Sequence, residues 1–166
     1  MTQHIGWEWI AGFFEGEGCV CWQEGRKGTK QGMGGRLIIG QKDKRPLQAI
    51  YDFLIAEGFS KPQFYLRPAR KASGPCWMLS VCVRRDVIRM IEAMLPWLFQ
   101  KTDKALMVLD RLTAASAEHD RLRSLALQLK RDGASWAVVR SRLGISRKAV
   151  VVYSRLISER EDGLTA

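Results

Sequence analysis

Hydrophobic and polar positions along the first 115 residues follow two periods. Apolar residues recur every three or four positions in four stretches, which predicts helices, and every second position in four others, which predicts strands. The first three helices and the four strands follow the order αββαββα, and a further helix comes after them. We therefore expect an α+β fold with an antiparallel four-stranded sheet, helices on one face and a ligand on the other. The predicted helices span 7–15, 46–58, 86–95 and 101–115, and the predicted strands span 19–24, 36–42, 63–67 and 76–84.

The alternation also predicts which face of the sheet each strand residue occupies. In strand 36–42, Leu37, Ile39 and Gln41 would face the helices, and the residues between them would face outward. A slip of one residue would exchange the two faces, because successive side chains of a strand point to opposite sides. The outward positions that we expect to read a ligand are Gln23, Arg36, Ile38, Tyr65, Arg67, Met78 and Ser80.

After residue 115 the pattern becomes helical and basic. Residues 121–131 predict one helix, and Ser135 and Ser146 predict N-caps of two more, separated by a turn at Gly144. This arrangement resembles a helix-turn-helix, in which Arg147 and Lys148 would begin the recognition helix. The alternative is a helical hairpin that packs on the rest of the protein with its charges solvated. We therefore expect two domains, residues 1–116 and 117–166. The predicted small core is Leu125, Leu129, Val139, Leu143, Ile145, Val150 and Leu156.

The first predicted helix ends on two carboxylates, Glu15 and Glu17, set among glycines. Acids are disfavoured at a helix C-terminus by roughly 0.3–1 kcal/mol each, and a divalent cation would offset that cost. Residues two apart do not share a helix face, so the two acids should have different roles. Gly12 and Gly16 do share a face, next to Ala11, which would let a second copy of the helix approach closely.

Residues 10–18, IAGFFEGEG, resemble the LAGLIDADG motif of homing endonucleases, with Ile in place of Leu and Glu in place of Asp. The resemblance implies that Glu17 and the carbonyl of Gly16 bind the catalytic metal, Mg²⁺ or Mn²⁺. It extends to the αββαββα order and assigns active-site positions to Gln41 and Lys101. The competing interpretation is an apolar helix with a glycine-rich end, where Gln41 only ends a strand and Lys101 only begins a helix.

A single motif supplies one hydrolytic centre, so the resemblance implies a homodimer. Such a dimer would bind a long pseudo-palindromic double-stranded DNA target and hydrolyse both strands, leaving short 3′ overhangs. Two alternatives remain open: a transcription regulator that binds DNA without cutting it, and a maturase that acts on intron RNA. Besides the outward strand positions, we expect DNA contacts from basic residues in two loops, Arg26, Lys27, Lys30 and Arg70.

Composition agrees with a nucleic-acid partner. Lys and Arg number 27 against 17 Asp and Glu, a formal net charge of +10, although a ribosomal or merely basic protein would share this property. No apolar run reaches the ~18 residues of a membrane span and no signal peptide is evident, so we expect no membrane and a cytoplasmic (bacterial or phage) or organellar location.

The cysteine and histidine residues argue against two other kinds of site. Cys19, Cys21, Cys76 and Cys82 have a poor spacing for zinc, so we expect free thiols in a reducing compartment. The two histidines, His4 and His119, are far apart in the sequence, which disfavours a histidine-based nuclease.

Overall fold

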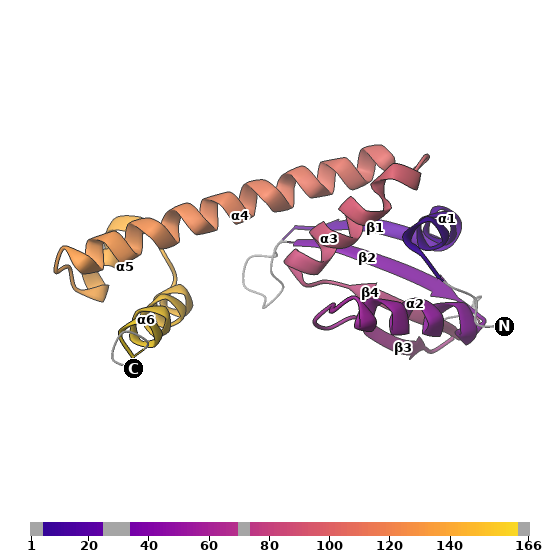
Figure 1. Ribbon diagram of the computed structural model, residues 1–166, viewed down its shortest axis with the longest axis horizontal. Coiled ribbons are helices and arrows are strands. Elements are labelled where there is room, and N and C mark those ends of the chain that lie inside the picture. Colours follow the sequence, from indigo (N-terminus) through magenta and orange to yellow (C-terminus); the bar gives the residue numbers. More distant parts are fainter. Residues whose placement is uncertain (1–4, 25–33, 70–73, 163–166) are drawn as a thin grey trace. The chain divides into compact units, whose positions relative to one another are not determined.

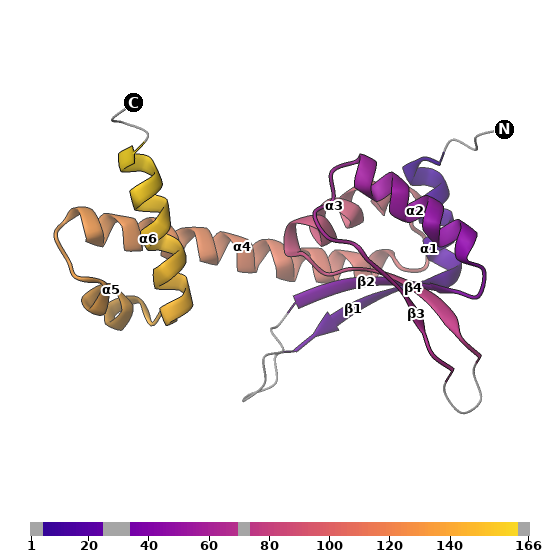
Figure 2. The same cartoon turned by 90° about the horizontal axis from the view of Figure 1, so that it is seen from below.

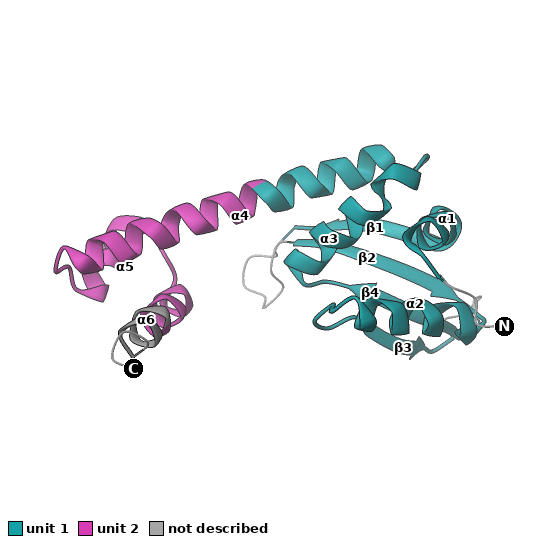
Figure 3. Ribbon diagram, in the orientation of Figure 1, with its two compact units in different colours: residues 1–113 teal, residues 114–166 magenta. Residues whose placement is uncertain are grey.

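The computed structural model describes residues 5–24, 34–69 and 74–162, with side chains through residue 155. The chain forms two compact units, Met1–Thr113 and Ala114–Ala166 (Figure 3). The predicted DNA contacts at Arg26, Lys27, Lys30 and Arg70 lie outside the described residues.

Unit 1 has the predicted α+β order, and its strands form one antiparallel sheet in the order β1-β2-β4-β3. Figures 1 and 2 show α1, α2 and α3 on the same face of this sheet. The fold class predicted from the alternation of apolar residues is therefore confirmed. The elements are α1 Trp7–Glu17, β1 Gly18–Gln23, β2 Gly34–Gln41, α2 Lys44–Ala56, β3 Gln63–Arg67, β4 Cys76–Val81, α3 Arg84–Met94, the 3₁₀ turn η1 Leu95–Trp97, and α4, which begins at Thr102.

The core of unit 1 lies between the sheet and these helices. Leu37 and Ile39 of β2 are buried there, so the predicted phase of this strand is confirmed and Arg36 and Ile38 face outward. Each fully buried aliphatic or aromatic side chain stabilises the fold by roughly 1.5–3 kcal/mol. The contributing helix residues include Ile10, Phe14, Leu47, Ile50, Leu54, Val87, Ile91, Ala105, Val108 and Leu112.

Helix α4 differs from the prediction. The structure has one helix over Thr102–Arg131 where the sequence predicted two, over 101–115 and 121–131. Residues 114–120 contain three alanines and neither Gly nor Pro, so nothing in them ends a helix. An ion pair between Glu118 and Arg121, three residues apart, adds local support. The boundary between the two units falls within this helix.

Unit 2 comprises the second half of α4 with α5 Trp136–Leu143 and α6 Arg147–Asp162. Ser135 and Ser146 accept hydrogen bonds from the backbone N–H groups of Val138 and Ala149, so both predicted N-caps are confirmed. Gly144 ends α5 with a left-handed φ of 62°, a conformation that glycine adopts at little cost. Three residues, 144–146, therefore connect α5 to α6.

The core of unit 2 is small, and its membership differs from the prediction. Leu156, which was predicted to belong to it, lies outside the residues whose side chains are described. Leu125 was predicted to be buried but is 41% exposed, because Ala126, one residue later on α4, occupies the buried position. Tyr153 was not predicted and is almost fully buried, with its ring edge against His119. The other members are Leu122, Leu129, Ala134, Trp136, Val139, Leu143, Ile145, Ala149 and Val150. No helix in the described part of the chain is both long and apolar enough to cross a membrane.

Candidate active site and nucleic-acid interface

Helix α1 continues to Glu17, two residues beyond its predicted end, and β1 begins at the next residue. The change of direction depends on Gly18, whose N–H donates to the carbonyl of Phe14. A Cβ atom at Gly18 would lie 2.3 Å from the ring of Phe14, so only glycine fits here. Both acids of the motif therefore stay within the last turn of a rigid helix.

The carboxylate of Glu15 holds the segment that leads into α4. Its Oε1 accepts from the N–H groups of Phe99 (2.7 Å) and Lys101 (3.2 Å), and its Oε2 accepts from that of Gln100 (3.2 Å). Burial by itself would raise the pKa of Glu15, but these three hydrogen bonds and the charge of Lys101 outweigh it, and the pKa is lowered. Glu15 is thus a structural carboxylate that stays ionised.

Glu17 has the opposite environment. It is exposed, and no residue in the described ranges forms a hydrogen bond or an ion pair with its carboxylate. The hydrogen bonds at this helix end use the carbonyls of Phe14 and Glu15, and Gly16 is exposed beside them. An unpaired carboxylate oxygen next to a backbone carbonyl suits a hard divalent cation such as Mg²⁺ or Mn²⁺.

The structure brings Lys101 to the same helix end. Its ammonium group donates to the carbonyl of Glu15, two residues from Glu17, and lies 6.0 Å from the centre of the Phe14 ring. A cation is favourable at this position because the C-terminus of a helix carries partial negative charge. Lys101 therefore combines a structural contact with a positive charge near the exposed acid.

Gln41 is the last residue of β2. The register pairs Gly18 with Ile39, and this carries Gln41 two residues past Gly18, to the side where α1 ends. Its Oε1 accepts from the N–H of Lys42 at 2.8 Å. Lys101 thus contacts the end of α1, and the strand register brings Gln41 to the same side of the sheet. Among the described residues, no group of three acidic, histidine or cysteine side chains could hold a metal ion.

The exposed face of α1 is formed by Gly12, Gly16 and Trp9. The ring of Trp9 stacks on that of the half-buried Phe13, with centroids 5.3 Å apart. A Cβ atom on either glycine would meet nothing within 4 Å, so this face is open. Ala11 was predicted to belong to it but is 0% exposed in the core of unit 1. The prediction for Ala11 is wrong because a neighbour in sequence is rotated by about 100° around a helix.

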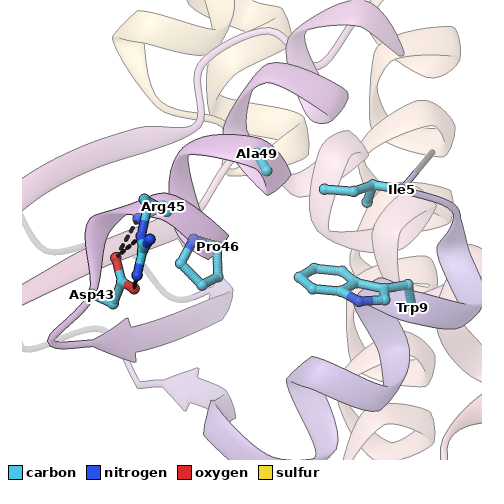
Figure 4. Close-up of a pocket in the computed structure, with 6 residues that line it drawn as sticks. All are labelled: Ile5, Trp9, Asp43, Arg45, Pro46 and Ala49. Carbon is cyan, nitrogen blue, oxygen red and sulfur yellow. Dashed lines mark hydrogen bonds and ion pairs between the residues drawn. The ribbon is translucent and has the colours of Figure 1, made fainter. Parts of the chain in front are cut away.

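A pocket of about 340 Å³ lies between the first half of α1 and the beginning of α2. Figure 4 shows the Trp9 ring on one side of it and Pro46, with the ion pair of Asp43 and Arg45, on the other; Ile5 and Ala49 complete the lining. Hydrogen bonds from the Arg45 side chain and backbone lower the pKa of Asp43 to about 2. Trp9 and Glu17 are eight residues apart on α1, roughly 12 Å along the helix, so this pocket is separate from the acidic site.

The strand residues that were predicted to contact a ligand lie on the outward face of the sheet, where they face one another across neighbouring strands. Arg36 pairs with Cys21, and its guanidinium Nε donates to the thiol of Cys82 at 2.9 Å. Ser80 faces the same side but is 1% exposed, and its hydroxyl donates to Oε1 of Gln63. Gln63, which the prediction omitted, presents the accessible polar group at this position. Gln23, Arg36, Ile38, Tyr65 and Arg67 are at least partly exposed, whereas Met78 is 9% exposed.

An αββαββα unit whose first helix ends in the motif acids beside an antiparallel sheet is the arrangement that the resemblance implied. The architecture of unit 1 therefore agrees with the predicted α+β core. No protein-family model and no curated protein matches the sequence.

Solved structures similar to this chain include three DNA complexes of homing endonucleases. I-CvuI with its target in the presence of calcium is 20% identical over 84% of this chain and 95% of its own, with a TM-score of 0.49. The group I intron-encoded I-CeuI is 17% identical over 72% of this chain and 60% of its own, with a TM-score of 0.48. The LAGLIDADG homing endonuclease I-SmaMI bound to cleaved DNA is 16% identical over 86% of this chain and 44% of its own, with a TM-score of 0.43.

Two features of unit 1 could not be predicted from the sequence. The partners of Glu15 lie 84 to 86 residues further along the chain, and no local pattern signals such a contact. Phe99 is 88% exposed and Trp97 is 47% exposed, and both belong to the segment that Glu15 holds against the end of α1. An aromatic run around a proline, Leu95–Phe99, was the available signal.

The two acids should differ in their effect on stability. Glu15→Gln should lower the free energy of unfolding by about 1–3 kcal/mol, because an amide NH₂ group would face backbone donors that lose their acceptor. Glu17→Gln should leave it within about 0.5 kcal/mol, since the side chain is exposed. Urea unfolding of both variants at pH 7 makes the comparison.

Because the pKa of Glu15 is lowered on folding, its contribution to the free energy of unfolding is present above the ordinary carboxyl pKa. That contribution is lost as the pH falls from this value through the lowered pKa of the folded state. Equal destabilisation by the two variants would contradict the assignment.

Proposed function

We propose that this protein is a site-specific homing endonuclease that binds a long pseudo-palindromic DNA target as a homodimer and cuts both strands with Mg²⁺ or Mn²⁺, leaving short 3′ overhangs. The observation that carries the proposal is the contrast between the two acids: Glu15 is fully used by backbone donors, and Glu17 is exposed without a partner among the described residues. A carboxylate kept free at a helix C-terminus costs stability and has no structural use.

The proposed chemistry divides among four groups. Glu17 and the carbonyl of Gly16 would hold the metal ion, which supplies a water of lowered pKa and stabilises charge on the phosphodiester. Gln41 would orient water near the scissile phosphate. The ammonium of Lys101, fixed at the end of α1, would attract the phosphate and offset the negative charge that develops on it.

The open face of α1 supports the homodimer. One chain has one free Glu17, so cutting both strands requires two copies, and a two-fold axis beside α1 would bring both acids together. Gly12 and Gly16 permit close helix approach, and the exposed ring of Trp9 beside them supplies apolar area. In this homodimer the sheets of the two copies would contact DNA with their outward faces, where Arg36 and Arg67 suit guanine and Gln23 suits adenine.

Unit 2 supports additional DNA contacts. The three-residue turn between α5 and α6 and the caps at Ser135 and Ser146 are typical of a helix-turn-helix. Arg147, Lys148, Val151, Val152 and Arg155 are all exposed on α6, and such a face could reach phosphates and thymine methyl groups. We propose residues 1–116 as the cutting domain and residues 117–166 as the added DNA-binding domain.

Glu17→Gln should abolish cutting and preserve DNA binding, because it removes a metal ligand with little change in volume. The variant first selects binding sites from a library of random duplexes, and the wild type is then assayed on these sites with Mg²⁺ or Mn²⁺ and with EDTA. Cutting by the variant at the wild-type rate would show that the site is elsewhere. If the wild type binds its selected site and never cuts, the protein is the non-cleaving regulator; selective binding of intron RNA would favour the maturase.

Gly12→Leu should prevent dimer formation without unfolding the monomer. The added side chain meets no atom of its own protomer, and replacing a helical glycine should favour the helix by up to about 1 kcal/mol. Light scattering on DNA should give the wild type twice the 18.9 kDa chain mass per target and the variant a single chain. Ala56→Leu adds an equally exposed leucine to α2 and should remain dimeric. A wild type that is monomeric both free and on DNA would refute the interface.

Replacing Arg147 and Lys148 with Ala should weaken binding and flatten the slope of log K against log salt by about one unit per lost phosphate contact. The charge-matched control replaces Arg45 and Arg89, which lie on α2 and α3, the helices that cover the inner face of the sheet, and should keep the wild-type slope. Cutting with excess protein should survive in the test variant, because Glu17 belongs to unit 1. Equal slopes for test variant and wild type would reject DNA contact by the beginning of α6.

A further inference from the structure

All four cysteines lie on the outward face of the sheet or at its edge. Cys19 and Cys21 alternate with Val20, which is buried in the core, and Cys76 alternates with the inward Leu79 and Val81. Cys82 follows β4 and accepts the hydrogen bond from Arg36. The proposed cutting chemistry uses none of these thiols, although they share the face that would contact DNA.

Two of the thiols touch each other. The Sγ atoms of Cys19 and Cys21 are 3.3 Å apart, and in the described part of the chain no other pair of thiols is in hydrogen-bonding contact. Cys76 contacts the carbonyl of Trp77, and Cys82 contacts Arg36 and Ser80. Cys19 is the exposed member of the four, while the other three are half-buried.

The surroundings distinguish the two members of the pair. Burial raises the pKa of Cys21, and the hydrogen bond and charge of Cys19 raise it further, against the opposing charges of Lys104 and Arg36. Cys19 is exposed and Cys21 is half-buried, so a dissolved oxidant reaches the sulfur of Cys19 first. Glu17 lies two residues before Cys19, and Arg36 lies opposite Cys21.

We propose that Cys19 and Cys21 form a peroxide-reactive dithiol that closes into a reversible disulfide. The sulfur of Cys19 attacks a hydroperoxide, the O–O bond breaks, and Cys19 becomes a sulfenic acid while an alcohol or water leaves. The sulfur of Cys21 then attacks that of Cys19, the S–O bond breaks, and water leaves with the proton of Cys21. Two thiols are oxidised and one peroxide is reduced.

The geometry of a strand makes this disulfide easy to reduce. Residues two apart in a strand have Cα atoms about 6.6 Å apart. That distance is near the upper end of the range that disulfides span, ~6.8 Å, and bonds at such limits are more reducible. Closing the bond would pull the beginning of β1 together, between Glu17 and the position opposite Arg36. If the outward face binds DNA, as the proposed function requires, oxidation should weaken that binding.

The first measurement follows the thiols alone. Reduced protein is treated with one equivalent of hydrogen peroxide, and the remaining thiols are titrated. The mass of the peptide that contains residues 19 and 21 is then measured by mass spectrometry. Two of the four thiols should disappear, and this peptide should lose the mass of two hydrogen atoms. Cys19→Ser and Cys21→Ser should each prevent this product, whereas the matched variants Cys76→Ser and Cys82→Ser should form it normally. Oxidation that falls first on Cys82, beside Arg36, or four intact thiols, would overturn the proposal.

The second measurement follows DNA binding with a fluorescent duplex that carries a site selected from the random library by Glu17→Gln. The oxidised wild type should bind about fivefold or more weakly than the reduced protein, the lower end of what one lost base contact costs. Dithiothreitol should restore the affinity, and peroxide should not change that of Cys19→Ser. Equal affinity of the two states rejects the effect on binding. A reduced protein that does not bind DNA rejects the proposed function, and the thiol titration still decides whether the disulfide forms.

Discussion

The carboxylate of Glu15 joins parts of unit 1 that are distant in the sequence. By accepting three successive backbone N–H groups from residues 99–101, it ties the last turn of α1 to the segment that begins α4. Lys101 returns the contact through its ammonium group, which caps a carbonyl at the end of α1. This reciprocal contact places a lysine beside Glu17 without using Glu17, so one acid fixes the site and the other remains free.

The sequence was sufficient for the sheet and its faces because the strands are buried on one side. One-sided burial produces a period of two, and Leu37 and Ile39 fixed the phase of β2. Glu17, Gln41 and Lys101 came from a motif resemblance, and their approach to the end of α1 depends on sheet register and on Glu15. The contacts of Glu15 cross 84 to 86 residues and leave no local pattern. At Ala11 and Leu125 the predicted face of the helix was wrong by one residue. A weak apolar stripe does not define which side of a helix is buried.

The open face of α1 is consistent with a site that one chain cannot complete. Trp9 and Phe13 stack on each other beside two glycines that have free space above them. A monomer gains little from glycines on an exposed helix face, since each costs roughly 0.8–1 kcal/mol relative to alanine. That cost is explained if a second helix packs there, and in the proposed homodimer the same contact would bring the Glu17 of a second copy close to the first.

The outward face of the sheet has few free hydrogen-bonding groups for a surface that is proposed to recognise a long DNA target. The hydroxyl of Ser80 donates to Gln63, and one nitrogen of the Arg36 guanidinium donates to the thiol of Cys82. Met78 is almost buried. In the proposed complex, the remaining polar residues would distinguish only a few base pairs on each side, because each good bidentate contact contributes about 1–3 kcal/mol of discrimination. Further recognition would have to come from outside the sheet, and the exposed basic and apolar residues of α6 have suitable chemistry. Unit 2 would then serve specificity, while the geometry at the end of α1 would serve cutting.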